Sequence, residues 1–487
     1  MPASFEEFDD LAWDHGNALF LEWKKRLTLR QTYYDVAKKV EEHANSGRAT
    51  KIDPPQKGAF NVYYRVHFSH GPKALIRFPI PAYFQYREEK LMGEVAVMRY
   101  VADKTSVPVP LVLYHGSAEE SPGGLGPFVI MEWVENEGDL ADVLNTPGLA
   151  YSDPPVLNPQ IDPEILDEVY SQLADILLQL YACDLEAIGS LDFLDGDVTR
   201  DPVVCRRPLS LNLSQLVNFA RVPDFELPSR SQTYKSSSEY YRVLADMHLR
   251  QLSFQRNQAI SSADDCRRKY VARQLFRYAA SRNRLADPRF DRGPFKLWCD
   301  DLRPANILVG RNNSIAAVID WEFAYAAPAE FAFSPPWWLL LKAPDDWEAG
   351  LDDWVDKYEP RFRHFLSVLE RRERELIEQG RMDTPHRLSG CMRESWESGH
   401  FWVAYAAQRS WAFDAIYWKF LDERLFGKNE SGDLRERLKL LPAEQVHAME
   451  EFVERKLREK NERTLVDWHA EPDARARASV PAAILDR

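Results

Sequence analysis

The segment 298–308 reads Trp298-Cys-Asp-Asp-Leu-Arg-Pro-Ala-Asn-Ile-Leu308, and Ala317-Val-Ile-Asp320 follows it closely. Asp301 precedes Asn306 by five residues, and each of the apolar runs beside them is typical of a short strand. Phosphoryl transfer requires a carboxylate that can receive a proton and oxygen ligands for a metal ion. The order of Asp301, Asn306 and Asp320 therefore predicts this chemistry and the kind of fold that supports it.

Each of the three residues has a chemical role and also a plain structural alternative. Asp301 can accept the proton of an acceptor hydroxyl, and Asn306 and Asp320 can hold Mg²⁺, which prefers hard oxygen ligands. Alternatively, Asp301 could cap a helix, Asn306 could fix a turn and Asp320 could simply end a strand. The three occur together, in order and next to apolar strands, and this combination favours the chemical interpretation.

A cation for the phosphates, and an acid to hold that cation, are expected upstream. In Ala74-Leu-Ile-Arg-Phe78 the apolar residues alternate, so Arg77 faces away from them. Glu94 lies on the following helix, in register with Leu91 and Met98. We predict an Arg77–Glu94 ion pair at a nucleotide site. The alternative is a surface arginine at a strand edge and a solvated helix glutamate.

The overall pattern predicts an α+β fold with two lobes, a small sheet-containing lobe and a large helical one. Residues 195–238 have little periodicity and are predicted to form a long loop or an insertion. Runs rich in apolar and β-branched residues predict strands at 61–68, 74–78, 111–114, 127–131, 307–309 and 316–319. Apolar residues at helical spacing predict helices within 1–50 and at 88–103, 162–184, 238–286, 347–380, 391–427 and from Pro442 onwards.

Composition narrows the possible partners and the compartment. The formal net charge of −14 argues against non-specific binding to nucleic acid or to an anionic membrane. No apolar run approaches the length of a membrane span, and Met1 to Arg30 lacks the apolar core of a secretory signal. The five cysteines are widely spaced and form no CxxC pair, which argues against a disulfide framework or a zinc site. We therefore expect a cytoplasmic protein, and the sequence leaves its oligomeric state open.

Several segments together resemble the aminoglycoside phosphotransferase-like family, particularly its fungal "phosphotransferase enzyme family" members. The resemblance covers roughly residues 55–345. Its motifs are Leu75-Ile-Arg-Phe-Pro79, Glu94-Val-Ala-Val-Met-Arg-Tyr-Val101, Val107-Pro-Val-Pro110, Pro127-Phe-Val-Ile-Met-Glu-Trp133, Ile188-Gly-Ser-Leu191, Gln255-Arg-Asn257, Asp301-Leu-Arg-Pro-Ala-Asn-Ile-Leu308 and Asp320-Trp-Glu322.

The resemblance implies a protein-kinase-like fold with a small antiparallel-sheet N-lobe and a large helical C-lobe. It also implies ATP and Mg²⁺ as cofactors and a small-molecule hydroxyl as the phosphate acceptor. Glu132 and Val134 would flank the hinge, where backbone groups contact the adenine. We expect an N-terminal helical segment, a nucleotide-binding N-lobe, a C-lobe with the catalytic and metal site, and a C-terminal helical extension, at residues 1–50, 51–135, 136–427 and 428–487.

Three departures from the family pattern keep a second hypothesis open. Cys299 stands where the family usually has His, Arg77 replaces the usual Lys, and no glycine-rich GxGxxG loop follows Gly58. These features motivate a catalytically weak, kinase-like binding or regulatory protein as the alternative. A protein kinase is a third possibility, but Ala327-Pro-Ala-Glu330 follows Asp320 too closely to leave room for an activation segment.

Trp337 and Trp338 also have two interpretations. They could line the acceptor pocket and stack on an apolar or cationic substrate. Two tryptophans in the core of the large lobe are the simpler expectation.

Overall fold

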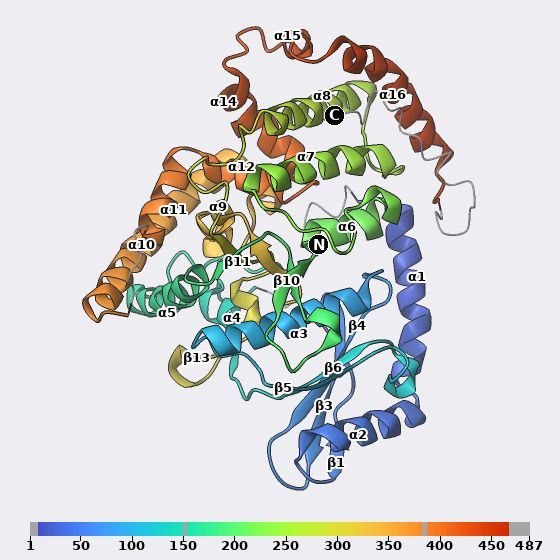
Figure 1. Cartoon of the computed structure of the whole chain (residues 1–487), viewed down its shortest axis with the longest axis vertical. Helices are drawn as coiled ribbons and strands as arrows, with labels where there is room; N and C mark the ends of the chain where they lie inside the picture. The colour runs from blue at the N-terminus through green and yellow to red at the C-terminus, as the bar shows by residue number, and fades with distance from the viewer. Residues whose placement is uncertain (1–7, 150–152, 382–386, 467–487) are drawn as a thin grey trace.

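The computed structural model describes residues 8–149, 153–381 and 387–466. Figure 1 shows a sheet with its helices in the lower part and a larger array of helices above it. A sheet-containing N-terminal part followed by mostly helical structure confirms the predicted α+β class. The division at residues 50, 135 and 427 stays a prediction, and residues 467–487 of the expected extension lie outside the described residues.

The N-terminal sheet is antiparallel, and its strands lie in the order β1-β3-β4-β6-β5, with β2 paired to β3. β3 and β4 form the predicted hairpin, with Tyr63 opposite Arg77. β4 also pairs with β6, which places Val129 opposite Arg77 on the other side. The strands are β1 (Ala49–Ile52), β2 (Gln56–Lys57), β3 (Asn61–Phe68), β4 (Ala74–Pro79), β5 (Val112–Gly116) and β6 (Phe128–Glu132).

α2 (Arg30–Ala44) packs on one face of this sheet, and α1 (Asp10–Leu27) runs along the side of the sheet, with Trp23 and Leu27 in the same core (Figure 1). Alternating residues of the central strands, Ile76 among them, are buried against apolar residues of both helices. The Tyr64 hydroxyl donates to the Leu27 carbonyl at 2.7 Å, and this bond fixes the end of α1 over β3. The predicted N-terminal helices are therefore part of the core of the sheet.

The opposite face of the sheet carries Arg77 and packs on α3 (Arg87–Lys104), the predicted helix at 88–103. α3 ends before Val107-Pro-Val-Pro110, as expected because proline cannot continue a helix. The Pro108 carbonyl accepts a hydrogen bond from the Val318 N–H at 2.8 Å. This contact ties the segment after α3 to the strand that leads into Asp320.

The larger part of the chain is mostly helical. α7 packs on α8, α16 covers α8, and α10 packs on α5. Its helices are α4 (Leu140–Leu144), α5 (Pro163–Tyr181), α6 (Leu211–Phe219), α7 (Ser237–Phe254), α8 (Ala263–Ser281), α9 (Ala329–Ala332), α10 (Leu351–Glu378), α11 (Leu388–Glu397), α12 (His400–Ala407), α13 (Phe413–Ile416), α14 (Asp422–Phe426), α15 (Leu434–Leu438) and α16 (Ala443–Glu462).

This part also contains three small sheets, with the strand orders β14-β11-β8, β13-β12-β7 and β10-β9. The predicted strands at 307–309 and 316–319 are the β12–β13 hairpin. The strands are β7 (Gly138–Asp139), β8 (Asp184–Leu185), β9 (Ser190–Asp192), β10 (Val203–Arg206), β11 (Phe295–Cys299), β12 (Ile307–Val309), β13 (Ile315–Val318) and β14 (Ala324–Ala327).

The prediction of one long loop at 195–238 is wrong, because this segment contains β10 and α6. Ser210 caps α6 by accepting a hydrogen bond from the Leu213 N–H at 3.2 Å. The predicted helix at 238–286 is two helices, α7 and α8, and the one at 391–427 is divided into shorter helices. Short elements such as α6 carry too few apolar repeats for periodicity to identify them.

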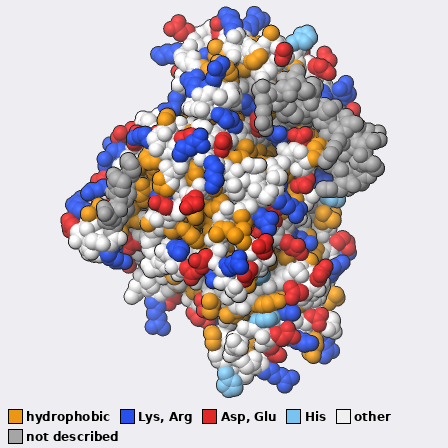
Figure 2. Space-filling view, in the orientation of Figure 1, with side chains coloured by type: hydrophobic (Ala, Val, Ile, Leu, Met, Phe, Trp, Pro, Cys, Tyr) orange, Lys and Arg blue, Asp and Glu red, His pale blue; other side chains and the backbone are white. Residues whose placement is uncertain are grey.

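Figure 2 shows acidic and basic side chains interspersed over one face of the molecule, with hydrophobic side chains gathered near its centre. Among the described residues, no helix combines the length and the apolar character needed to span a membrane.

Buried Glu330, at the start of α9, provides a prediction about stability and pH. One of its oxygens accepts a hydrogen bond from the Asp287 N–H at 2.9 Å, and the other lies 3.3 Å from the Ser237 hydroxyl. Burial raises the pKa of Glu330 to about 7. At a pH between 4.5, the usual pKa of glutamate, and about 7, Glu330 is deprotonated in the unfolded chain but protonated in the folded protein. This group therefore contributes stability at low pH that is lost as the pH rises through 7.

Glu330→Gln should remove this loss of stability at high pH, because glutamine can keep both hydrogen bonds and carries no charge. We expect the variant to gain about 1–3 kcal/mol over the natural protein at pH 8 and little at pH 4.5. Urea unfolding of both proteins across this range measures the difference. A stability difference that does not change with pH would contradict the prediction.

Candidate active site

Asp301 lies in the loop 300–306, which begins where β11 ends. One of its carboxylate oxygens accepts a hydrogen bond from Nε of Arg303 at 3.0 Å, and the other from Nδ2 of Asn306 at 3.0 Å. The side chain of Asp301 is 16 % exposed. Burial raises the pKa of Asp301, while Arg303 and Asn306 oppose this effect. The carboxylate of Asp301 is therefore fixed by two hydrogen bonds and is still accessible to the hydroxyl group of a ligand.

Asn306 is buried, and the same hydrogen bonds set the direction of its amide group. Its Nδ2 also donates to the backbone carbonyl of Asp301 at 2.8 Å. With both bonds on the nitrogen, Oδ1 is left for another partner. The backbone carbonyl of Asn306 accepts a hydrogen bond from the Ile319 N–H at 2.9 Å, which brings Asn306 next to the residue before Asp320.

Asp320 follows β13 at the point where the β12–β13 hairpin returns to the loop 300–306. Its φ of 59° is left-handed, an uncommon backbone conformation for an aspartate outside a regular turn. Its side chain is 32 % exposed. Burial is the main cause that raises the pKa of Asp320, and nearby Glu322 adds to it. The structure therefore brings Asp301, Asn306 and Asp320 to one place.

Arg77 reaches this place from β4 of the N-terminal sheet. It forms the expected ion pair with Glu94 of α3, and both side chains are buried. Its Nη1 also lies 2.5 Å from Oδ1 of Asp320. Burial alone would lower the pKa of Arg77, but Glu94 and Asp320 raise it. The alternative of a surface arginine is wrong, and its role toward phosphates stays a prediction.

Glu132 is the last residue of β6, which runs beside β4, and Val134 lies two residues beyond it. An oxygen of the Glu132 side chain accepts a hydrogen bond from the Leu111 N–H at 3.0 Å. The Val134 carbonyl accepts one from the Asn136 side chain at 2.9 Å. Glu132 is three residues beyond the partner of Arg77, roughly 10 Å along the strand. The two residues are therefore apart from the Arg77 cluster, and their predicted contact with adenine remains a prediction.

Sequence reasoning missed a second buried ion pair beside the first, between Lys90 of α3 and Glu322. Nδ2 of Asn61 donates to Glu322 at 2.9 Å, and the Asn61 oxygen lies 3.3 Å from the Lys90 ammonium. Burial alone would raise the pKa of Glu322, but Lys90 and Arg77 hold it below its usual range.

Two signals in the sequence point to this pair. Lys90 lies four residues before Glu94, so both project from the same face of α3. Glu322 lies two residues after Asp320, within the motif Asp320-Trp-Glu322. The contact itself joins residues more than two hundred positions apart, and local pattern does not reveal such pairs.

Lys90→Met should therefore destabilise the protein strongly. It would leave the buried carboxylate of Glu322 without its cation, and such a loss typically costs about 3–5 kcal/mol. Urea unfolding of Lys90→Met, Glu322→Leu and the double variant measures the coupling. We expect the double variant to recover much of the loss, since no buried charge is then unpaired. Equal stability of Lys90→Met and the natural protein would refute the pair.

The turn between β2 and β3 lies where the missing glycine-rich loop would be. The Phe60 ring in this turn contacts the Phe323 ring edge to face, with centroids 5.6 Å apart. Asn61, the next residue, binds Glu322 as described above. The turn is therefore fixed to the segment that follows Asp320, by an aromatic contact and a hydrogen bond.

Cys299 and Asp300 precede the catalytic candidate in the chain. Cys299 is buried in β11 opposite Ala324 of β14, and burial raises the pKa of its thiol. Asp300 accepts hydrogen bonds from the Leu211 N–H at 2.8 Å and from Nε1 of Trp298 at 2.7 Å. Asp300 thereby attaches the start of α6 to the loop 300–306, a structural role that sequence reasoning did not assign.

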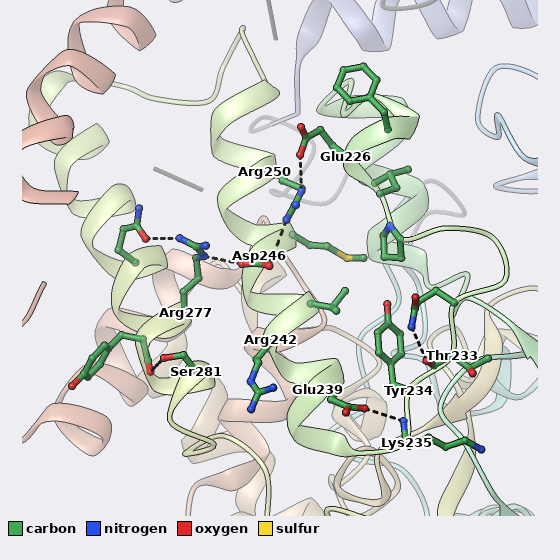
Figure 3. Close-up of a pocket in the computed structure, with 18 of the residues that line it drawn as sticks. Glu226, Thr233, Tyr234, Lys235, Glu239, Arg242, Asp246, Arg250, Arg277 and Ser281 are labelled. Carbon is green, nitrogen blue, oxygen red and sulfur yellow. Dashed lines mark hydrogen bonds and ion pairs between the residues drawn. The ribbon is translucent and has the colours of Figure 1, made fainter. Parts of the chain in front are cut away.

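A cleft of about 910 Å³ lies elsewhere, along α7 and α8 (Figure 3). Arg250 pairs with Glu226 at 3.1 Å, and Arg277 pairs with Asp246 at 2.8 Å. None of the predicted site residues lines this cleft. The cleft is therefore separate from the site around Asp301.

A family model described as the phosphotransferase enzyme family matches residues 51–369. The chain belongs to this family. The matched range contains every predicted site residue, and it supports a phosphotransferase activity and the kinase-like fold that the sequence predicted. No curated protein matches the chain.

Several solved structures resemble this family member. A GDP complex of an aminoglycoside 2'-phosphotransferase-IIIa mutant is 15 % identical, with 84 % of this chain and 98 % of that chain covered and a TM-score of 0.40. A ternary complex of a thermostable aminoglycoside phosphotransferase APH(4)-Ia mutant with AMP-PNP and hygromycin B is 15 % identical (79 % and 99 % covered, TM-score 0.40). A macrolide 2'-phosphotransferase type I is 11 % identical (82 % and 97 % covered, TM-score 0.41).

Proposed function

We propose that this family member transfers the γ-phosphoryl group of ATP to a hydroxyl group of a small molecule. The observation that carries the proposal is the ion pair of Arg77 with Asp320, because it joins the N-terminal sheet to the end of β13, which is hydrogen-bonded to the loop that holds Asp301. A phosphate that replaced the carboxylate as the partner of Arg77 would lie beside both Asp301 and Asn306. The reacting groups would thus lie close together, and positioning such groups is the main contribution of a protein to phosphoryl transfer.

Asp301 would accept the proton of the acceptor hydroxyl. Its carboxylate is held on both oxygens by Arg303 and Asn306, so its position is fixed before the acceptor arrives. As the acceptor oxygen forms its bond to phosphorus, the bond from phosphorus to the leaving oxygen of ADP breaks. The proton of the hydroxyl passes to Asp301.

Asn306 and Asp320 would hold Mg²⁺, and the donors present suit this ion. Asp320 offers a carboxylate, and Asn306 offers an amide oxygen whose nitrogen is already engaged. Among the described residues, no group of three or more His, Cys, Asp or Glu could hold a metal ion by itself. This suits Mg²⁺, which keeps several waters and uses one or two protein ligands together with phosphate oxygens. When bound, Mg²⁺ would neutralise charge on the phosphates.

Arg77 would bind the phosphates as a planar fork, in the position where the family usually has Lys. Glu94 would keep the guanidinium in place from α3. The backbone of Glu132 and Val134 would contact the nucleotide base at the end of β6. Complexes of related phosphotransferases with AMP-PNP and with GDP are consistent with a nucleotide donor.

A small-molecule acceptor is favoured over a protein by the chain after Asp320. Residues 321–331 are buried and include β14, which pairs with β11. A protein kinase would carry an exposed activation segment here, to bind its peptide substrate. Complexes of structurally similar phosphotransferases contain hygromycin B and streptomycin, which are small molecules.

A thermal-shift titration with ATP tests the nucleotide and metal parts of this proposal. We expect ATP with Mg²⁺ to raise the unfolding midpoint, because the ligand binds only the folded protein. The rise should largely disappear when EDTA removes the metal. An unchanged midpoint with Mg²⁺ and ATP, or an equal rise in EDTA, would overturn the proposal.

A further inference from the structure

Helix α3, which carries the partner of Arg77, is held at its beginning by a distant segment of the chain. Glu89 lies in the first turn of α3 and forms an ion pair with Arg207, which follows β10. Nε of Arg207 donates to one oxygen of the Glu89 carboxylate at 3.0 Å, and Nη2 donates to the other oxygen at 3.0 Å. A pair with two parallel hydrogen bonds fixes the relative orientation of the two groups as well as their distance.

Arg207 has further contacts that anchor it. Its side chain is 1 % exposed, and its Nη1 donates to the Pro228 carbonyl at 2.9 Å. Its guanidinium lies over the ring of Tyr86, 4.5 Å from the ring centre. Tyr86 directly precedes α3, and its hydroxyl donates to the Asp224 carboxylate at 2.5 Å. The beginning of α3 is therefore attached to residues 207–228, which we call the brace.

The brace is also attached to the loop that holds Asp301. It contains α6, and the N–H of Leu211, the first residue of α6, donates to Asp300 at 2.8 Å. Leu211 is four residues beyond Arg207, so the two attachments are close together in the chain. Figure 1 shows this segment in green, passing from β10, beside α3, to α6. The brace thus joins α3 to the loop 300–306.

The position of α3 matters because Glu94 lies on this helix. Helix α3 has a second attachment, the buried ion pair of Lys90 with Glu322. Glu89 and Lys90 are neighbours in the helix, so their side chains point in directions about 100° apart. The two ion pairs therefore hold α3 from two sides, roughly one turn before the residue that pairs with Arg77.

We propose that Arg207 is a positioning residue for the nucleotide: by holding α3, it keeps Glu94 and Arg77 in the arrangement that binds the phosphates. The inference rests on the proposed function, in which Arg77 binds those phosphates. Without the Arg207–Glu89 pair, α3 would be held from one side only, and the guanidinium of Arg77 would take a wider range of positions. A displacement of about 1 Å can lower a rate about 100-fold, so a small movement of α3 is enough to matter.

Arg207→Lys should weaken the binding of ATP with Mg²⁺ to the full chain about tenfold, as calorimetry can measure. Lysine keeps the charge beside Glu89 but acts as a point charge, so the two parallel bonds are lost. Adenosine, which has no phosphates, should bind the variant and the natural protein equally, and ligand-observed NMR measures this. Unchanged affinity for ATP with Mg²⁺, or an equal loss of affinity for adenosine, would overturn the proposal.

Arg437→Lys is a matched control that separates positioning from stability. Arg437 of α15 forms a buried pair with Asp422 of α14, with Nε donating to both carboxylate oxygens at 2.9 Å. Both substitutions should lower the midpoint of urea unfolding, but only Arg207→Lys should weaken the binding of ATP. An equal loss of affinity in both variants would attribute the effect to stability alone and refute the positioning role.

Tyr86→Phe keeps the inference testable if Arg207→Lys does not fold. It removes only the hydroxyl that donates to Asp224 and leaves the ring beside Arg207. The Asp224 side chain is 51 % exposed, so water can replace the lost donor. We expect a smaller loss of affinity for ATP with Mg²⁺, about threefold, and unchanged binding of adenosine. If Tyr86→Phe bound ATP as tightly as the natural protein, the brace would have no role in nucleotide binding.

Hydrogen exchange without nucleotide distinguishes a failure of this inference from a failure of the proposed function. Arg207→Lys should speed the exchange of the amides of α3, because the helix opens more easily, and Arg437→Lys should not. Faster exchange in α3, combined with a natural protein that does not bind ATP, would support the brace and contradict the proposed function. Unchanged exchange in α3, combined with normal ATP binding by the variant, would overturn the brace and leave phosphoryl transfer standing.

Discussion

Asp301→Asn should lower kcat by roughly 10²–10⁴-fold, the usual contribution of a positioned general base. Asparagine has nearly the same shape but cannot take up the proton of the acceptor. Its amide oxygen can still accept the hydrogen bond from Arg303. The bond from Asn306 to the side chain is lost, but Asn306 keeps its bond to the backbone carbonyl of residue 301, so the loop should keep its conformation. Binding of ATP with Mg²⁺ should change little, since Asp301 is not assigned to the metal. Steady-state kinetics combined with nucleotide titration measure both effects.

Asp201→Asn is a matched control, because Asp201 is exposed and lies outside the site. It should keep full activity. If Asp301→Asn retained the natural kcat, the assignment of the base would be wrong.

Asp320→Asn should abolish the dependence of ATP binding on Mg²⁺. Loss of a residue that only supports a metal ligand commonly weakens metal affinity by about 10–100-fold, and loss of a ligand should do at least as much. The asparagine oxygen can still meet Arg77, so the fold should persist. Titration with Mg²⁺ at fixed ATP measures the change in affinity.

Stability without ligands provides the control for Asp320→Asn. Burial raises the pKa of Asp320, so its charge is held at a cost to the folded protein. The variant should therefore be at least as stable as the natural protein at pH 8 while it loses function, as expected for a strained site. A variant that unfolds more easily and still binds ATP with Mg²⁺ normally would refute the metal assignment.

Local patterns predicted the parts of the structure that local geometry controls. Alternation in β4 placed Arg77 on the face opposite Ile76, and helical spacing placed Glu94 inward on α3. The pair that they form follows from these two directions. The spacing of Asp301 and Asn306 likewise fits one short loop closed by a hydrogen bond.

Contacts between residues far apart in the sequence could not be predicted from these local patterns. Glu322 meets Lys90 and Asn61 only because the turn after β2 packs onto the segment after β13. α6 was missed because its single cap and short apolar run resemble a loop in the sequence.

The transfer of phosphate itself tests the account most directly. The natural protein and Asp301→Asn are incubated with ATP, Mg²⁺ and a mixture of small alcohols, and ³¹P NMR follows the products. We expect ADP to appear together with a new phosphomonoester signal in the small-molecule fraction, and the variant to form neither at a comparable rate. ADP with inorganic phosphate alone, or no consumption of ATP by the natural protein, would contradict the account.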